Sequence, residues 1–237
     1  MSGTAALTGD ASLERLAAAI RRISAVAVGR PVSDQVLDEA AATLARVADT
    51  LEARAENRKR PRSQPHAGSD PRQIFPTSPA IGTANPVAPP AYLWAVAGQN
   101  GQREIRGRVT FDYPYEGPPT CVHGGVIAEL FDELLGTANI IADQAGMTGT
   151  LTVRYRKPTP LLAPLDLVAR HTGTERRKVF TWAGIYHAGE LTAEADGIFI
   201  SMPPGRMLDI VTANARDAGA PVVDAEFIEL IAEAPAD

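Results

Sequence analysis

The sequence predicts an α+β fold in which an antiparallel sheet wraps around one long central helix. One helix-length segment, residues 122–143, is much more hydrophobic than a helix that lies on a protein surface. Strand-like segments lie on both sides of it in the chain, two before it and four after it. A sheet packed around this helix would bury the helix's apolar side chains.

Residues 1–58 predict an N-terminal helical hairpin. The first helix, residues 12–28, repeats apolar side chains at helical spacing, namely Leu13, Leu16, Ile20 and Ile23. The second begins near Ser33 and fades by Arg58, and its apolar stripe is formed by Val36, Leu37, Ala40, Leu44, Val47 and Leu51. We expect the two apolar faces to meet each other or a partner surface, as ordinary packing rather than as a lid.

Residues 59–90 change in composition. A basic run of Arg58, Lys59, Arg60 and Arg62 leads into a stretch rich in Pro, Gly, Ser and Asn. This composition predicts a Pro-rich linker or arm rather than a core element. The basic run would suit a targeting or nucleic-acid signal, but a solvated tether is the commoner reading.

Residues 91–203 form the predicted main domain. Strands are expected at 91–96 and 104–111, then a loop at 113–120, the central helix, and strands at 148–157, 164–175, 178–187 and 190–201. Residues 204–237 are expected to be a C-terminal tail with a weak helical stretch at 223–232.

Composition narrows the function classes. The net charge of −5 makes a nucleic-acid partner unexpected. Because Cys121 is the only cysteine, no intrachain disulfide can form, and a reducing cytoplasm is predicted. We expect no membrane span, no secretory signal in residues 1–10, and neither a metal ion nor another cofactor. Cys121 lies beside His123, but no third catalytic partner is visible, so a small residue at the mouth of the helix is favoured over a nucleophile.

The central helix begins at His123-Gly124-Gly125. The first turn of a helix has free N–H groups and a partial positive charge, so it can hold a carbonyl oxygen and the oxyanion that develops from it. Glycines there allow a ligand to approach bare backbone. A tight turn with a capping histidine remains an equally open interpretation.

Three acids lie on the side of this helix opposite its apolar side: Glu129, Asp132 and Glu133. On a helical wheel Asp132 has two small neighbours, Ala128 and Gly136, which leave room for a ligand or another chain to reach its carboxylate. The wheel alone does not choose among the acids, and a solvated acidic face also fits.

His123 and Asp132 are nine residues apart, which is roughly 13 Å along a straight helix. They also face opposite sides. If both are catalytic, the site combines the helix start of one subunit with the acid of another, which predicts a homodimer with two composite sites.

The string His123-Gly124-Gly125, with Asp132 in the same helix, resembles the PaaI-like and THEM-type hotdog-fold acyl-CoA thioesterases. The resemblance continues through residues 147–158, where an aliphatic strand ends in Tyr155-Arg156-Lys157-Pro158. It covers about residues 91–203, roughly half of the chain. It implies a hotdog fold, an acyl-CoA substrate and a homodimer that can pair again into a homotetramer.

The resemblance also implies roles for individual residues. Asp132 would activate water or attack the thioester directly, and Thr148 would orient the water. Gly125 would donate its backbone N–H to the thioester oxygen, with His123 supporting the helix start. Contacts to the CoA phosphates would come from basic side chains: Arg154, Arg156, Lys157, Arg177 and Lys178. Charge that protects an exposed strand edge is the alternative interpretation of these residues.

Two other functions fit the same fold. One is an acyl-CoA or acyl-carrier binding protein without turnover, against which Asp132 and Thr148 argue together. The other is a dehydratase or hydratase, whose hydration motif does not occur in this sequence. His171 and His187 are interpreted as ordinary strand histidines.

Overall fold

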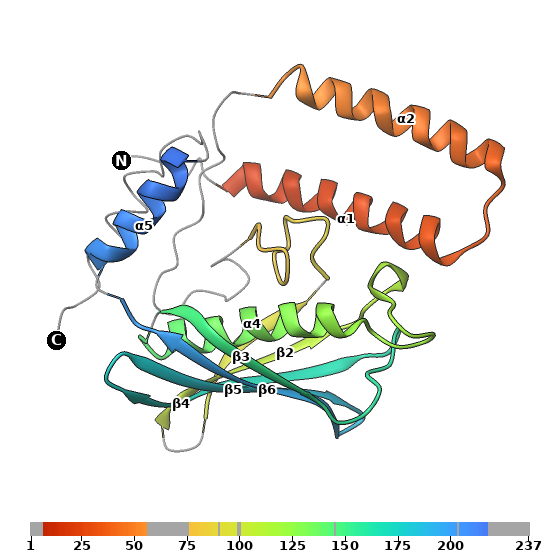
Figure 1. Ribbon diagram of the computed structural model, residues 1–237. Helices are drawn as coiled ribbons and strands as arrows, with labels where there is room; N and C mark the ends of the chain where they lie inside the picture. Colours follow the sequence, from red (N-terminus) through yellow and green to blue (C-terminus); the bar gives the residue numbers. More distant parts are fainter. Residues whose placement is uncertain are drawn as a thin grey trace.

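A computed structural model of the chain describes residues 7–55, 76–89, 91–98, 101–144, 146–202 and 204–217. It confirms the hotdog fold, a six-stranded antiparallel sheet that curves around α4 (Figure 1). The strand order is β1-β2-β4-β5-β6-β3. The strands are β1 (Tyr92–Ala97), β2 (Arg103–Val109), β3 (Met147–Tyr155), β4 (Leu165–Glu175), β5 (Lys178–His187) and β6 (Glu190–Ile200).

Helix α4 (Gly124–Ile141) fills the concave side of the sheet. All six side chains that the wheel placed on its apolar side are at most 2% exposed: Ile127, Leu130, Phe131, Leu134, Leu135 and Ala138. Beneath them, Ala169, Ala183 and Ala195 are register partners on β4, β5 and β6, and each is 0% exposed. Small side chains in the middle of the sheet allow a bulky helix face to come close.

The N-terminal region contains the two expected helices, α1 (Leu7–Gly29) and α2 (Asp34–Glu52). Helix α1 is anchored to the body: Arg21 donates to the carbonyl oxygens of Asn85 and Thr83, and Ala17 is 1% exposed. Gly29 lies so close to the ring of Tyr113 that a side chain would not fit there. Helix α2 contains no buried residue.

The prediction that residues 59–90 stay out of the core is wrong for part of that segment. In residues 76–89, Ile81 is 1% exposed and belongs to the hydrophobic core. The segment is a series of turns held by its own hydrogen bonds, such as Gly82 N to Ser78 O and Ala84 N to Pro76 O. Its Pro, Gly, Ser and Asn residues therefore serve packed turns rather than a linker. The basic run at 58–62 lies outside the described residues.

The tail prediction also needs correction, because residues Pro204–Asp217 form a helix, α5. The expected helical stretch at 223–232 lies outside the described residues. Within the residues that the structure describes, none of the helices has the length and apolar character that crossing a membrane would require.

Candidate active site

The start of α4 is fixed from three sides. His123 is the N-cap residue, and its Nδ1 accepts the backbone N–H of Gly125 at 3.0 Å. The backbone N–H of His123 donates to the carbonyl oxygen of Tyr115 at 2.9 Å. From β3, the hydroxyl of Tyr155 donates to the carbonyl oxygen of Gly124 at 2.7 Å. The capping histidine that the sequence left open is therefore present, and the N–H of Gly125 is occupied by it.

Space nevertheless remains beside this helix start. A side chain at Gly125 would meet only the ring of His123, at 3.1 Å, and both residues are exposed. A ligand can therefore reach the backbone of Gly125 from solvent. An oxygen of that ligand could accept the N–H of Gly125 in one of two ways. It would share the hydrogen with His123 Nδ1, or the His123 ring would turn away.

Asp132 lies two turns further along α4, where its carboxylate accepts the hydroxyl of Thr148 at 2.7 Å. This contact joins the middle of α4 to the start of β3, and Asp132 is half-buried. A side chain built at the neighbouring Gly136 would meet nothing closer than a ring carbon of Phe199 at 3.8 Å. The structure thus brings two of the sequence-predicted residues together and leaves open space next to them.

Strand β3 is an edge of the sheet, and it connects the two halves of the site. It pairs with β6 on one side, and most of its residues are exposed. Thr148 at its start contacts Asp132, whereas Tyr155 at its end contacts Gly124. On α4 these two contacts are eight residues apart, at Asp132 and Gly124, which is about 12 Å along the helix. One chain alone therefore does not bring the helix start and the carboxylate to a common carbonyl group.

The basic residues at the end of β3 are paired with carboxylates of the same chain. Arg154 pairs with Asp196, Arg156 Nε lies 2.9 Å from Glu194, and Lys157 Nζ lies 2.8 Å from Glu190. The hydrogen bond from Arg156 lowers the pKa of Glu194, and that from Lys157 lowers the pKa of Glu190. This cross-strand ladder agrees with the reading of a charged strand edge.

The two other predicted CoA contacts lie at the opposite end of β3. Arg177 donates through Nε to the carbonyl oxygen of Ser201 at 3.2 Å, and Lys178 pairs in register with Ile200. Ile200 is also the partner of Met147, the first residue of β3. Within one chain, the five basic residues therefore form two separate groups.

Sequence reasoning missed two buried polar side chains, Asn139 on α4 and Thr181 on β5. Asn139 is 1% exposed, and neither its Oδ1 nor its Nδ2 has a hydrogen-bond partner in the described part of the chain. It lies seven residues after Asp132, within about 20° of it on the wheel and about 10 Å further along. The hydroxyl of Thr181, 1% exposed, also has no partner. An amide inside an apolar helix gives little sequence signal.

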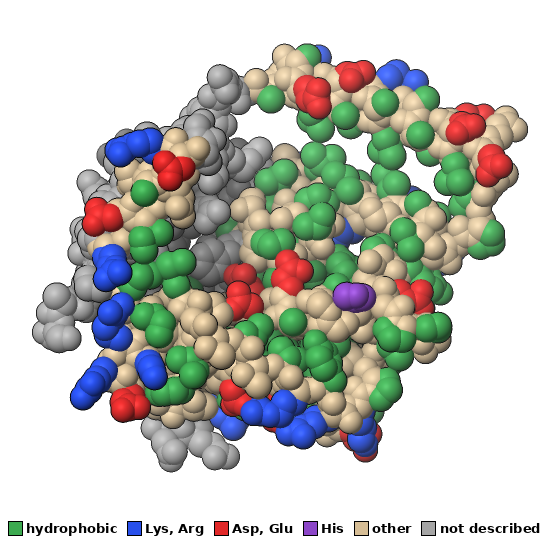
Figure 2. Space-filling model, viewed as in Figure 1, with side chains coloured by type: hydrophobic (Ala, Val, Ile, Leu, Met, Phe, Trp, Pro, Cys, Tyr) green, Lys and Arg blue, Asp and Glu red, His purple; other side chains and the backbone are tan. Residues whose placement is uncertain are grey.

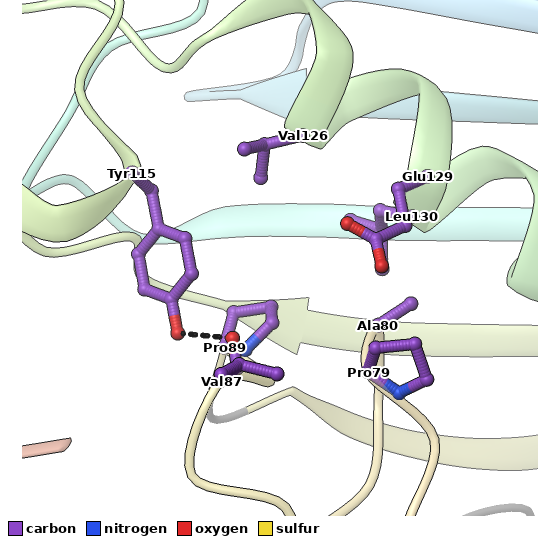
Figure 3. Close-up of a pocket in the computed structure, with 8 residues that line it drawn as sticks. All are labelled: Pro79, Ala80, Val87, Pro89, Tyr115, Val126, Glu129 and Leu130. Carbon is purple, nitrogen blue, oxygen red and sulfur yellow. Dashed lines mark hydrogen bonds between the residues drawn. The ribbon is translucent and has the colours of Figure 1, made fainter. Parts of the chain in front are cut away.

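A small cavity lies between α4 and residues 76–89 (Figure 3). It is lined by Pro79, Ala80, Val87, Pro89, Tyr115, Val126, Glu129 and Leu130. Burial raises the pKa of Tyr115 to about 12, and its hydroxyl donates to Val87 O at 3.0 Å. At about 40 Å³ the cavity has room for a few waters at most, far less than an acyl group needs. Half of its lining comes from residues 76–89, whose composition alone predicts a linker.

Among the described residues, His, Cys, Asp and Glu side chains form no group of three or more that could hold a metal ion.

Comparisons with known proteins agree with this picture. No family model matches the chain. Over 95 residues it is 36% identical to acyl-coenzyme A thioesterase THEM4 of Mus musculus, covering 39% of this chain, and over 94 residues 37% identical to that of Xenopus laevis, covering 38%. The match spans only 41% and 42% of those relatives' lengths. A crystal structure of a thioesterase superfamily protein is 32% identical with a TM-score of 0.71, covering 84% of this chain and 92% of that one.

Proposed function

This chain belongs to the thioesterase superfamily, and from that premise we propose that it hydrolyses acyl-CoA thioesters to a free acid and CoA. The observation that supports this most is the 2.7 Å hydrogen bond from Thr148 to Asp132 beside an open strand edge. The partial relatives bear the name acyl-coenzyme A thioesterase, which points to the same chemistry.

Asp132 supplies the base or the nucleophile. As a base, it takes a proton from a water that attacks the thioester carbon, and the thiolate of CoA leaves with that proton. As a nucleophile, its oxygen attacks the thioester carbon and the thiolate of CoA leaves, which forms an anhydride; water then attacks the aspartyl carbon of that anhydride, so the free acid departs with an oxygen of Asp132. The two routes differ in a single turnover in ¹⁸O-water, because a base places ¹⁸O in the first acid released, whereas a nucleophile first transfers an ¹⁶O of Asp132.

The active unit is a homodimer with two composite sites. If β3 pairs antiparallel with β3 of a second copy, the start of each strand lies beside the end of the other. The carboxylate of Asp132 is tied to the start of β3, and the helix start at Gly124 is tied to its end. Pairing therefore brings each carboxylate toward the partner's His123 and Gly125. Two such dimers could join into a tetramer without changing this arrangement.

In this site the backbone N–H of Gly125 binds the thioester oxygen and the oxyanion that follows. His123 Nδ1 accepts this N–H at 3.0 Å, so His123 must share or release it as substrate binds. Because His123 is exposed, solvent can replace this contact if the ring turns away.

The same pairing explains how CoA phosphates are held. Arg154, Arg156 and Lys157 lie at the end of β3, whereas Arg177 and Lys178 lie near its start. In an antiparallel dimer each group meets the other group of the partner, so the two form one basic site. Arg154, Arg156 and Lys157 would then contact a phosphate while they stay paired with their carboxylates on the same chain. A cytoplasmic location, predicted from the single cysteine, belongs to the same proposal.

The alternative is a protein that binds acyl-CoA or an acyl carrier without turnover. Purified protein is incubated with a panel of acyl-CoA esters and a thiol reagent, alongside Asp132→Asn. We expect thiol release from the wild-type protein and its loss in the variant. Binding without thiol release for every acyl group would support the alternative, and full activity in Asp132→Asn would remove the carboxylate from the mechanism.

A further inference from the structure

The N-terminal hairpin has an apolar lining that stays exposed in the described part of the chain. On α2, five large apolar side chains are 40–52% exposed: Val36, Leu37, Leu44, Val47 and Leu51. Figure 2 shows hydrophobic atoms along the side of α2 that is turned toward α1. On α1, three more are 37–41% exposed: Ile20, Ile23 and Val26. We call these eight residues the hairpin stripe.

Helix α1 does not need the hairpin stripe to hold its place. It is anchored through another side, where Arg21 binds the carbonyl oxygens of residues 83 and 85 and Glu14 accepts the hydroxyl of Thr83 at 2.6 Å. Helices α1 and α2 make almost no backbone contact with each other, although only residues 30–33 separate them. The hairpin is therefore open, and among the described residues neither of its apolar faces has a partner.

An open hairpin of this kind is costly in water. A helix of this length owes most of its stability to packing of its apolar face, and α2 contains no buried residue. Contiguous exposed apolar patches of several hundred Å² mark interaction surfaces in soluble proteins. The stripe is therefore the part of the described structure that most requires an occupant.

The size of the stripe suits a reciprocal contact between two copies. Burial of one such side chain removes about 60–120 Å², so eight that are about two-fifths exposed leave roughly 200–400 Å² per chain. A reciprocal contact buries twice that, and apolar atoms make up about 60% of an interface, which gives a total of roughly 700–1,300 Å². This reaches the lower range of specific protein contacts.

Charge selects which helices meet. Helix α2 contains five acids and one arginine, whereas α1 contains three arginines and two acids. An acidic helix is repelled by another copy of itself and attracted by a basic one. In a two-fold arrangement, α2 of each copy would therefore lie on α1 of the other. The hairpin stripe of each copy would then be covered.

We propose that the α1–α2 hairpin is an exchange arm. The α2 part of the hairpin stripe docks on α1 of a second copy of this chain, and α2 of that copy docks on α1 of the first. This association uses residues outside the thioesterase site. It stands or falls separately from the chemistry.

A photo-cross-link tests the proposal without requiring a known register. A benzophenone amino acid replaces Leu44 in the stripe, and, as a matched control, Ala45 on the opposite side of α2. Labelled (¹⁵N) and unlabelled protein are mixed, irradiated and analysed by denaturing gel and peptide mass spectrometry. We expect position 44, but not 45, to give a covalent dimer that joins the two isotopic forms and maps to residues 16–27.

Three results would overturn the exchange arm. A product of monomer mass that maps to α1 would mean that the hairpin closes on itself. A dimer that maps elsewhere would place the contact on another surface. Absence of any product at position 44 would mean that no protein covers the stripe.

A second measurement does not depend on cross-linking. Leu44→Asp should weaken one association step in sedimentation equilibrium at least about tenfold, whereas Ala45→Asp should leave every step within about twofold. Equal effects of the two variants would contradict the proposal, and circular dichroism verifies that both variants keep their helices. No thioester substrate enters either experiment, so a failed hydrolysis assay leaves the outcome readable.

Discussion

The hydroxyl of Thr148 should control the rate through the carboxylate of Asp132. Thr148→Val removes the hydroxyl and keeps the shape of the side chain. The lost hydrogen bond is 2.7 Å long and has a carboxylate as its acceptor. Such bonds contribute about 1.5–3 kcal/mol, and we take the lower half, about 1.5–2 kcal/mol, because Asp132 is only half-buried. This energy corresponds to a loss of about 10- to 30-fold in rate.

The assay is thiol release from acyl-CoA, with kcat and KM determined separately. We expect kcat to fall and KM to stay nearly constant, because Thr148 contacts Asp132 rather than the substrate in this arrangement. Thr148→Ser should keep most of the activity, since it retains the hydroxyl. Thr152→Val, an exposed substitution on the same strand, is the matched control. A Thr148→Val protein with kcat within about twofold of the wild type would refute the reasoning.

Three further predictions follow from the surroundings of the site. Tyr155→Phe removes the 2.7 Å hydrogen bond to Gly124 and should lower the free energy of unfolding by about 1 kcal/mol in a denaturant titration. An unchanged midpoint would show that this hydrogen bond does not contribute to stability. Asn139→Leu should raise that free energy by about 1–3 kcal/mol, because it removes a buried amide that has no hydrogen-bond partner among the described residues; a destabilised variant would indicate a partner outside them. Lys157→Gln should return the lowered pKa of Glu190 toward 4.5 in an NMR titration. Because the pKa of Glu190 is depressed, the stabilisation from this pair is present above that value and is lost as the pH falls through the folded-state pKa; a pKa that does not move would contradict the pairing.

The central helix was the easiest part to predict from sequence. Its apolar side chains recur at helical spacing, and the sheet buries those of Ile127 through Ala138 as the wheel indicated. Local periodicity fixes which face is buried, and hydrophobic burial does the rest. The wheel left three acids open, however, and only the resemblance singled out Asp132. The hydroxyl partner on β3 depends on a contact across sixteen residues of chain, which periodicity does not contain.

Features set by long-range pairing were harder to predict. The carboxylate partners of Arg154 and Arg156 lie on β6, about forty residues away, and follow from the β3–β6 register. Residues 76–89 have the composition of a linker, yet Ile81 lies in the core. Backbone hydrogen bonds between residues close in sequence fold the segment into turns. Composition reports local flexibility, whereas burial depends on what lies nearby in space.

The central claim is that each active site takes its carboxylate from one chain and its helix start from the other. Two variants separate these halves. Asp132→Asn removes the carboxylate. Gly125→Asp places a negative charge where the oxyanion would form; an acidic residue in the first turn of a helix is favourable electrostatically, and the added Cβ would meet only the exposed ring of His123, at 3.1 Å.

Each variant alone should be inactive. Coexpression with two different affinity tags and purification through both tags isolates the mixed dimer, in which one site carries both defects and the other carries none. Composite sites predict that this mixed dimer recovers about half of the wild-type activity, since one of two symmetry-related sites is intact. Mixed dimers that stay as inactive as the single variants would contradict the claim and place the whole site within one chain.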